Sequence, residues 1–173
     1  MLRISKLADY GTVLMTYMAK HPDELHTAKT IAAHTQITLP MASKILKLLT
    51  QAGLLNSARG AQGGYSMARE PQHINVVEII AALDGNIALT DCSSAVSECS
   101  LELICTIRNN WRLINQVVYE ALKTISLADL ADEKQRFQQA HYRILKNEKT
   151  HSPPSNFQVD AKSVIYQNLP RNK

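Results

Sequence analysis

The stretch 27–67 constrains the fold more than any other, because it joins two short helical periods through a tight turn. Apolar residues at helical spacing predict one helix over 27–34 and another over 39–51. Pro40 stands in the first turn of the second helix, where a missing N–H costs nothing. Gly53 follows its end, as glycine commonly does. This spacing predicts a helix-turn-helix.

The helix expected over 39–51 has two faces of different character. Its apolar side chains recur at helical spacing and are expected to face a core: Leu39, Ala42, Ile45, Leu46, Leu48 and Leu49. The other face carries Ser43, Lys44 and Lys47, which are free to meet an external partner. Lys44 and Lys47 are three residues apart and therefore share this face.

A wing is expected directly after this helix. Strand-like runs at 54–57 and 65–67 flank the glycine-rich tip 59–64. A helix in the major groove of DNA presents side chains to base edges, while nearby cations meet phosphates. Arg59 suits a narrow, electronegative minor groove, and the glycines let the wing backbone approach it. The stretch 27–67 therefore predicts a winged helix-turn-helix that binds double-stranded DNA. The alternative is a helical hairpin that packs on another protein.

The remaining chain predicts a mainly α protein with one long helix outside the winged unit. Helical periods are expected over 5–20, with Ser5 as N-cap, over 75–83 and over 106–124. We divide the chain into a DNA-binding domain, a cysteine-bearing loop, a dimerisation helix with the segment after it, and a weakly helical, then mostly disordered tail. The boundaries of these four parts are 1–85, 86–105, 106–130 and 131–173.

The long helix carries a broad apolar stripe, which indicates a contact with a second copy of the chain. The stripe comprises Ile107, Trp111, Ile114, Val117, Val118, Ala121, Leu122 and Ile125. We expect the dimer interface at Trp111, Ile114, Val118 and Leu122. A homodimer of helix-turn-helix units would read a palindromic site, because its two-fold axis relates two half-sites. The alternative is that the stripe closes the core of the monomer.

Composition limits the other classes of function. The net charge of +4 and the isoelectric point near 9.0 mildly favour a polyanionic partner. No apolar run approaches about 20 residues, so no membrane span is predicted. The opening residues have no apolar signal region, so we expect a cytoplasmic protein. We expect no enzyme, since no nucleophile–base pair is apparent and 60–64 lacks the lysine of a phosphate-binding loop.

Three cysteines lie within fourteen residues of irregular sequence, immediately before the long helix. Cys92, Cys99 and Cys105 can converge there, and thiolates are soft ligands that suit iron–sulfur clusters or zinc. The paired CxxC spacing typical of zinc ribbons is absent, and the wide spacing suits a cluster better than a single ion. The alternative is three ordinary cysteines in a loop. Beside a DNA-binding unit, the group indicates a sensor.

Several segments together form a pattern that none of them would specify alone. They are Met1-Leu2-Arg3-Ile4-Ser5-Lys6, Arg59-Gly60-Ala61-Gln62-Gly63-Gly64-Tyr65, Val76-Val77-Glu78-Ile79-Ile80, the three cysteines with Trp111, and Ile125-Ser126-Leu127-Ala128-Asp129-Leu130. Over about residues 1–130 the chain resembles the IscR/NsrR family of iron–sulfur transcription regulators. Within that family, residues 6–13 and 87–92 resemble the proteobacterial regulators of the SUF cluster-assembly operon.

The resemblance implies a homodimeric repressor or activator with a [2Fe–2S] or [4Fe–4S] cluster on Cys92, Cys99 and Cys105. Such a cluster is easily lost during aerobic preparation. Where some relatives have a histidine ligand, this chain has Arg108, which does not ligate. The resemblance implies Asp9 of the other subunit as fourth ligand. The competing candidates are Asp91, Glu98, Glu102, an exogenous thiol and water.

The resemblance also places the DNA contacts. It implies Thr38, Pro40, Met41, Ser43, Lys44 and Lys47 at the recognition helix, and Arg59, Gly60, Gln62 and Gly63 at the wing. Two other classes of function stay open: a cluster-free winged-helix regulator that senses by cysteine oxidation or zinc, and a redox or scaffold protein.

Overall fold

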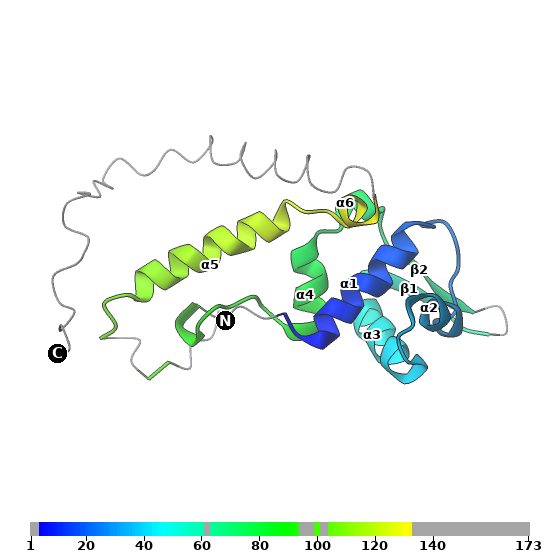
Figure 1. The fold of residues 1–173 in the computed structure, drawn as a ribbon, viewed down its shortest axis with the longest axis horizontal. Helices are drawn as coiled ribbons and strands as arrows, with labels where there is room; N and C mark the ends of the chain where they lie inside the picture. Colours follow the sequence, from blue (N-terminus) through cyan, green and yellow to red (C-terminus); the bar gives the residue numbers. More distant parts are fainter. Residues whose placement is uncertain (1–3, 61–62, 94–98, 101–103, 133–173) are drawn as a thin grey trace, which may run out of the picture.

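The computed structural model describes residues 4–60, 63–93, 99–100 and 104–132, and within these ranges the chain is mainly helical (Figure 1). Its elements are α1 (Lys6–Ala19), α2 (Ala28–Thr35), α3 (Leu39–Gln51), β1 (Leu55–Ala58), β2 (Gly64–Met67), the short 3-10 helix η1 (Pro71–His73), α4 (Val76–Asp84), the 3-10 helix η2 (Asp91–Ser93), α5 (Arg108–Lys123) and α6 (Leu127–Ala131). The predicted winged helix-turn-helix with one long helix outside it is confirmed.

The ends of the first helices follow from their capping residues. The Ser5 hydroxyl accepts hydrogen bonds from the N–H groups of Leu7 and Ala8, both at 3.1 Å, and so caps α1 as predicted. The predicted bounds of α3 are also confirmed. Gly53, just past the end of α3, has a φ of 73°, a left-handed conformation that favours glycine.

The core lies between α1, α3 and α4. The largest fully buried side chains are Leu14, Met15, Met18, Ile31, Ile45, Leu46, Leu49, Leu54, Leu55, Ile74, Ile79 and Leu127. The prediction that Leu39 faces this core is wrong, because its side chain is 46% exposed. Leu39 is the first residue of α3 and lies at the border of the buried arc formed by Ala42, Ile45 and Leu49.

The wing is an antiparallel hairpin that is tied to the helices behind it. β1 pairs with β2 from Leu55↔Met67 to Ala58↔Gly64. The backbones of His26 and Tyr65 exchange two hydrogen bonds, of 2.9 and 2.8 Å, so the segment just before α2 extends the hairpin. This approach is close: a Cβ on Gly64 would lie 2.7 Å from the carbonyl oxygen of His26. The wing is therefore held in a fixed place relative to the start of α2.

The chain returns to the winged core after α5. The Leu127 N–H donates to the Ile74 carbonyl at 2.7 Å, and the Val76 N–H donates to the Ile125 carbonyl at 3.0 Å. The Leu127 side chain is fully buried in the main core. In Figure 1, α6 accordingly lies near the start of α4, while α5 extends away from the winged unit. The segment after the long helix is thus part of the hydrophobic core of the winged unit.

Some predictions fall outside the described residues. The weakly helical, then mostly disordered tail is predicted over 131–173, and of this stretch the structure describes residues 131 and 132. None of the described helices is both long and apolar enough to span a bilayer.

We predict that Leu127→Ala lowers the free energy of unfolding by about 2–5 kcal/mol, because it leaves a cavity in the main core. Denaturant unfolding measures this loss. Val13→Ala, at an exposed position of α1, is the matched control and should change stability by less than about 0.5 kcal/mol. A Leu127→Ala protein as stable as the control would contradict the assignment of α6 to the core.

Candidate DNA interface and cysteine-bearing loop

The outer face of α3 carries four of the residues predicted to contact DNA. Pro40, Lys44 and Lys47 are exposed, and Ser43 is partly exposed beside them. They lie opposite the buried arc of α3, since successive residues are about 100° apart around a helix. Met41 is partly buried and packs against the core, so it offers less of its side chain to a partner.

The entry to α3 is open. Thr38 is the N-cap residue, but its side chain makes no capping hydrogen bond. Its exposed hydroxyl is therefore not used in holding the helix. The next two residues, Leu39 and Pro40, are exposed as well. The first turn of α3 thus presents a hydroxyl, a branched apolar side chain and a proline ring at the surface.

The backbone of the wing tip requires glycine at two positions, Gly60 and Gly63. Gly60 has a φ of 112°, in the region that favours glycine. The Gly63 N–H donates to the Gly60 carbonyl at 2.9 Å, and a Cβ on Gly63 would lie 2.4 Å from the Ala58 carbonyl oxygen. Arg59 is exposed beside this turn. Gln62, also predicted to contact DNA, lies outside the described residues.

The three cysteines are free thiols in different surroundings. Cys92 is buried in η2, and its Sγ lies 3.3 Å from the Thr90 hydroxyl. Cys99 and Cys105 are partly exposed. Among the described residues no three His, Cys, Asp or Glu side chains lie close enough together to hold a metal ion. The single chain therefore does not gather the predicted ligands at one point.

Asp9, the predicted ligand from the other subunit, is exposed on the first turns of α1. Its side chain lines an open groove of about 520 Å³ between α1, α4 and the segment around α6. The groove is otherwise mainly apolar, with Ile4, Val76, Ile80 and Ile125 among its walls. Asp9 is thus accessible from outside the chain.

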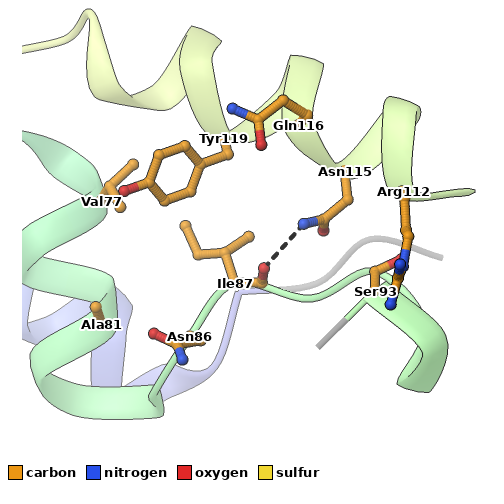
Figure 2. A pocket seen from close by; sticks show the side chains of 9 residues that line it. All are labelled: Val77, Ala81, Asn86, Ile87, Ser93, Arg112, Asn115, Gln116 and Tyr119. Atoms are coloured by element: carbon orange, nitrogen blue, oxygen red, sulfur yellow. Dashed lines mark hydrogen bonds between the residues drawn. The ribbon is translucent and has the colours of Figure 1, made fainter. Parts of the chain in front are cut away.

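Side chains of α5 hold the loop that leads to Cys92. The Asn115 side-chain oxygen accepts from the Leu89 N–H at 3.0 Å, and its amide donates to the Ile87 carbonyl at 3.3 Å. Arg112 Nε donates to the Cys92 carbonyl at 3.2 Å. Figure 2 shows both side chains reaching from α5 toward the loop. An open pocket of about 470 Å³ remains between α4, α5 and this loop.

The N-terminal part of the apolar stripe of α5 faces away from its own chain. The polar side chains Arg112, Asn115 and Gln116 and the phenol of Tyr119 line the pocket on the inner side (Figure 2). Large apolar side chains on and just before α5 are exposed: Ile107, Leu113, Ile114 and Val117, the last at 62%. A helix packed on its own domain normally turns its apolar face to the core and its polar face to water, whereas this part of α5 does the opposite.

The residues predicted for the dimer interface are divided between these two sides. Ile114 is exposed, and Trp111 and Val118 are partly buried. Leu122 instead packs on a small cluster of Ala8, Val76 and Ile80 in its own chain. At the C-terminal end of α5, the apolar stripe therefore packs within the monomer, as the alternative interpretation of the stripe expected.

Sequence reasoning missed the residues that hold the loop. Arg112 and Asn115 read as ordinary polar residues on the solvent side of an amphipathic helix. Their spacing of three, continued at Tyr119, does mark a second stripe beside the apolar one. The irregular segment after Gly85 had no period of its own that could have identified its partner.

A family model described as an iron-dependent transcriptional regulator, Rrf2, matches residues 4–133. The chain belongs to the Rrf2 family. The protein Rrf2 of Nitratidesulfovibrio vulgaris is 29% identical over 130 residues, which cover 75% of this chain and 87% of that protein.

Two solved structures are similar as well. The structure of CymR, described as the global cysteine regulator of B. subtilis, has a TM-score of 0.61 and 31% identity, and the match covers 76% of this chain and 97% of CymR. That of T. potens IscR has a TM-score of 0.60 and 31% identity, and the match covers 82% of this chain and 96% of IscR.

Membership of the Rrf2 family confirms three predictions: the resemblance to regulators of the IscR/NsrR type, a DNA-binding transcriptional regulator, and the absence of enzyme function. The specific resemblance to SUF regulators stays a prediction.

We predict that Asn115→Ala loosens the loop before Cys92, because it leaves the Leu89 N–H and the Ile87 carbonyl without their partner. The free energy of local opening, measured by amide hydrogen exchange at Leu89, should fall by about 1–3 kcal/mol. Gln116→Ala is the matched control, since Gln116 donates to the neighbouring Glu120 side chain on α5 itself. Equal exchange at Leu89 in both variants would contradict the role of Asn115.

Proposed function

We propose that this Rrf2-family protein is a homodimeric transcriptional regulator that senses iron–sulfur or redox status through a cluster on Cys92, Cys99 and Cys105. The observation that carries the proposal is a loop with three free thiols that hydrogen-bonds to α5, in a chain of an iron-dependent family. The resemblance of residues 6–13 and 87–92 to SUF regulators favours the SUF assembly operon as target.

On the DNA side, the proposal places α3 in the major groove and the wing in the adjacent minor groove. Lys44 and Lys47 would neutralise phosphates, while Ser43 and Thr38 would offer hydroxyls to bases or phosphates. The wing would bring the Arg59 guanidinium to the minor groove, where the tight turn through Gly60 and Gly63 allows a close approach. Gln62 completes the proposed wing contacts.

The reversed faces of α5 support the proposed homodimer. Four large apolar side chains, Ile107, Leu113, Ile114 and Val117, lie in water in the single chain. Burial of such a stripe on a second copy would be favourable by about 25 cal/mol for each Å² of apolar surface removed from water. A two-fold axis beside α5 would also arrange two winged units for a palindromic site.

The thiol donors suit an iron–sulfur cluster chemically, although they come together only if the loop rearranges around the group. When bound, the cluster would supply a redox centre that reacts with oxidants or nitric oxide. The thiolates of Cys92, Cys99 and Cys105 would hold it. Asp9 of the other subunit is the proposed fourth ligand, since its carboxylate is exposed beside an open groove.

The chain's own contacts supply a route from this loop to the DNA-binding unit. Asn115 and Arg112 join the loop to the inner face of α5. The C-terminal end of α5 leads into backbone hydrogen bonds with Ile74 and Val76, at the start of α4. A change in the loop would therefore shift α5 against α4, which packs on α1 and α3.

A second candidate is a cluster-free regulator that responds through its thiols. The similarity to CymR at 31% identity favours it, because that protein is described as a global cysteine regulator. Cys99 and Cys105 are partly exposed and could be oxidised without a metal.

The visible absorption of anaerobically purified protein, with iron and sulfide assayed on the same sample, separates the two candidates. We predict a cluster absorption band that is lost in Cys92→Ala, together with iron and sulfide. Ser93→Ala, at the next residue of η2, is the matched control and should keep the band. A colourless protein without iron, even after reconstitution, would contradict the cluster and leave the thiol-based regulator.

We predict that Val117→Lys makes the protein monomeric, because it places a charge in an apolar interface where its burial is costly. Analytical ultracentrifugation measures the change in mass, and binding to a palindromic site should weaken with it. Gln116→Lys, one residue away on the inner side of α5, should remain dimeric. The folded monomer should tolerate both changes, since both positions are exposed. A dimeric Val117→Lys protein would contradict the proposed interface.

A further inference from the structure

The apolar side chain of Leu39 lies at the surface of the helix proposed to enter the major groove. Three apolar residues of the same helix, Ala42, Ile45 and Leu49, are completely buried, whereas Leu39 is 46% exposed. The core therefore does not account for a large branched side chain at this position. Single exposed leucines are common on protein surfaces, so exposure alone does not indicate a function for Leu39. Its function is therefore inferred from the residues around it.

These surroundings favour DNA as the partner. Leu39 precedes Ser43 by one helical turn, so the two side chains are neighbours on one side of α3. Lys44 and Lys47 lie farther along the same exposed side and supply charges complementary to phosphates. Thr38, immediately before Leu39, has a hydroxyl that is not used as a helix cap. Leu39 is thus an apolar group among groups suited to nucleic acid.

The apolar character of the Leu39 side chain limits which groups of the DNA it can contact. A leucine side chain has no hydrogen-bond donor or acceptor, so it binds neither phosphate oxygens nor the polar edges of bases. In the major groove of unmodified DNA the 5-methyl group of thymine is the apolar feature, and apolar side chains contact it. The first residues of a recognition helix are those that reach base edges.

We propose that Leu39 reads the 5-methyl group of a thymine in each half-site and so contributes to the sequence specificity of this regulator. This inference rests on the proposed entry of α3 into the major groove. It adds a base-specific contact to that interface, whereas the proposed phosphate contacts of Lys44 and Lys47 would carry no base preference.

The experiment starts from duplexes that the full-length protein selects from random DNA. Each thymine of the selected site is then replaced by deoxyuridine, which lacks only the methyl group, and affinity is measured by fluorescence anisotropy at constant salt. For the wild type, replacement at one thymine of each half-site should weaken binding about fourfold, the effect expected for one buried methyl group.

Leu39→Ala should bind the thymine site more weakly and lose the distinction between thymine and deoxyuridine at that position. Leu39→Gln should lose it too, with a side chain of similar length. Val13→Ala, an exposed apolar position on α1, should retain the fourfold effect.

Three outcomes would overturn the inference. Wild-type binding insensitive to deoxyuridine at every thymine would exclude a methyl contact. Sensitivity that persists unchanged in Leu39→Ala would assign the contact to another residue. Selection that recovers no duplex would contradict the proposed DNA interface of α3 and the wing, and with it this inference, whereas the first two outcomes leave that interface intact.

Discussion

The return of the chain from α5 into the winged core is the contact on which the rest of the arrangement depends. Leu127 is completely buried there, and backbone hydrogen bonds join it to Ile74 and join Ile125 to Val76. Without this anchor, α5 would be attached to the winged unit through the irregular loop and the packing of Leu122. With it, the C-terminal end of α5 has a fixed position relative to α4, and the cysteine-bearing loop is held against the other part of the same helix.

The two faces of α5 then serve two different purposes. The inner face uses Asn115 and Arg112 to bind the backbone of the loop, so specific hydrogen bonds, together with the packing of Ile87, determine where the loop lies. The outer face exposes its apolar side chains to water in the single chain, which is unfavourable. Burial of the same side chains against a second copy would be favourable. A helix shared between the loop and a second subunit can carry a change in the loop to both DNA-binding units.

The sequence predicted most of the winged unit because local signals and packing agree there. The helical period over 39–51 predicted α3, and Ser5 predicted the start of α1; both helices begin at the expected residues. Other features depend on contacts between distant segments. Leu39 matches the apolar period but lies at the border of the buried arc, so its exposure follows from packing around the start of α3. The burial of Leu127 and the role of Asn115 likewise depend on partners far away in the sequence.

The central claim is that the state of the cysteine-bearing loop changes DNA binding, and one comparison tests it most directly. The Kd for the selected DNA site is measured on anaerobically purified protein before and after removal of its iron, at one salt concentration. We predict a change of about 5- to 150-fold, the usual range of coupling between two sites on one protein. Equal Kd values for the two forms would contradict the claim, because the loop would then have no influence on the winged units.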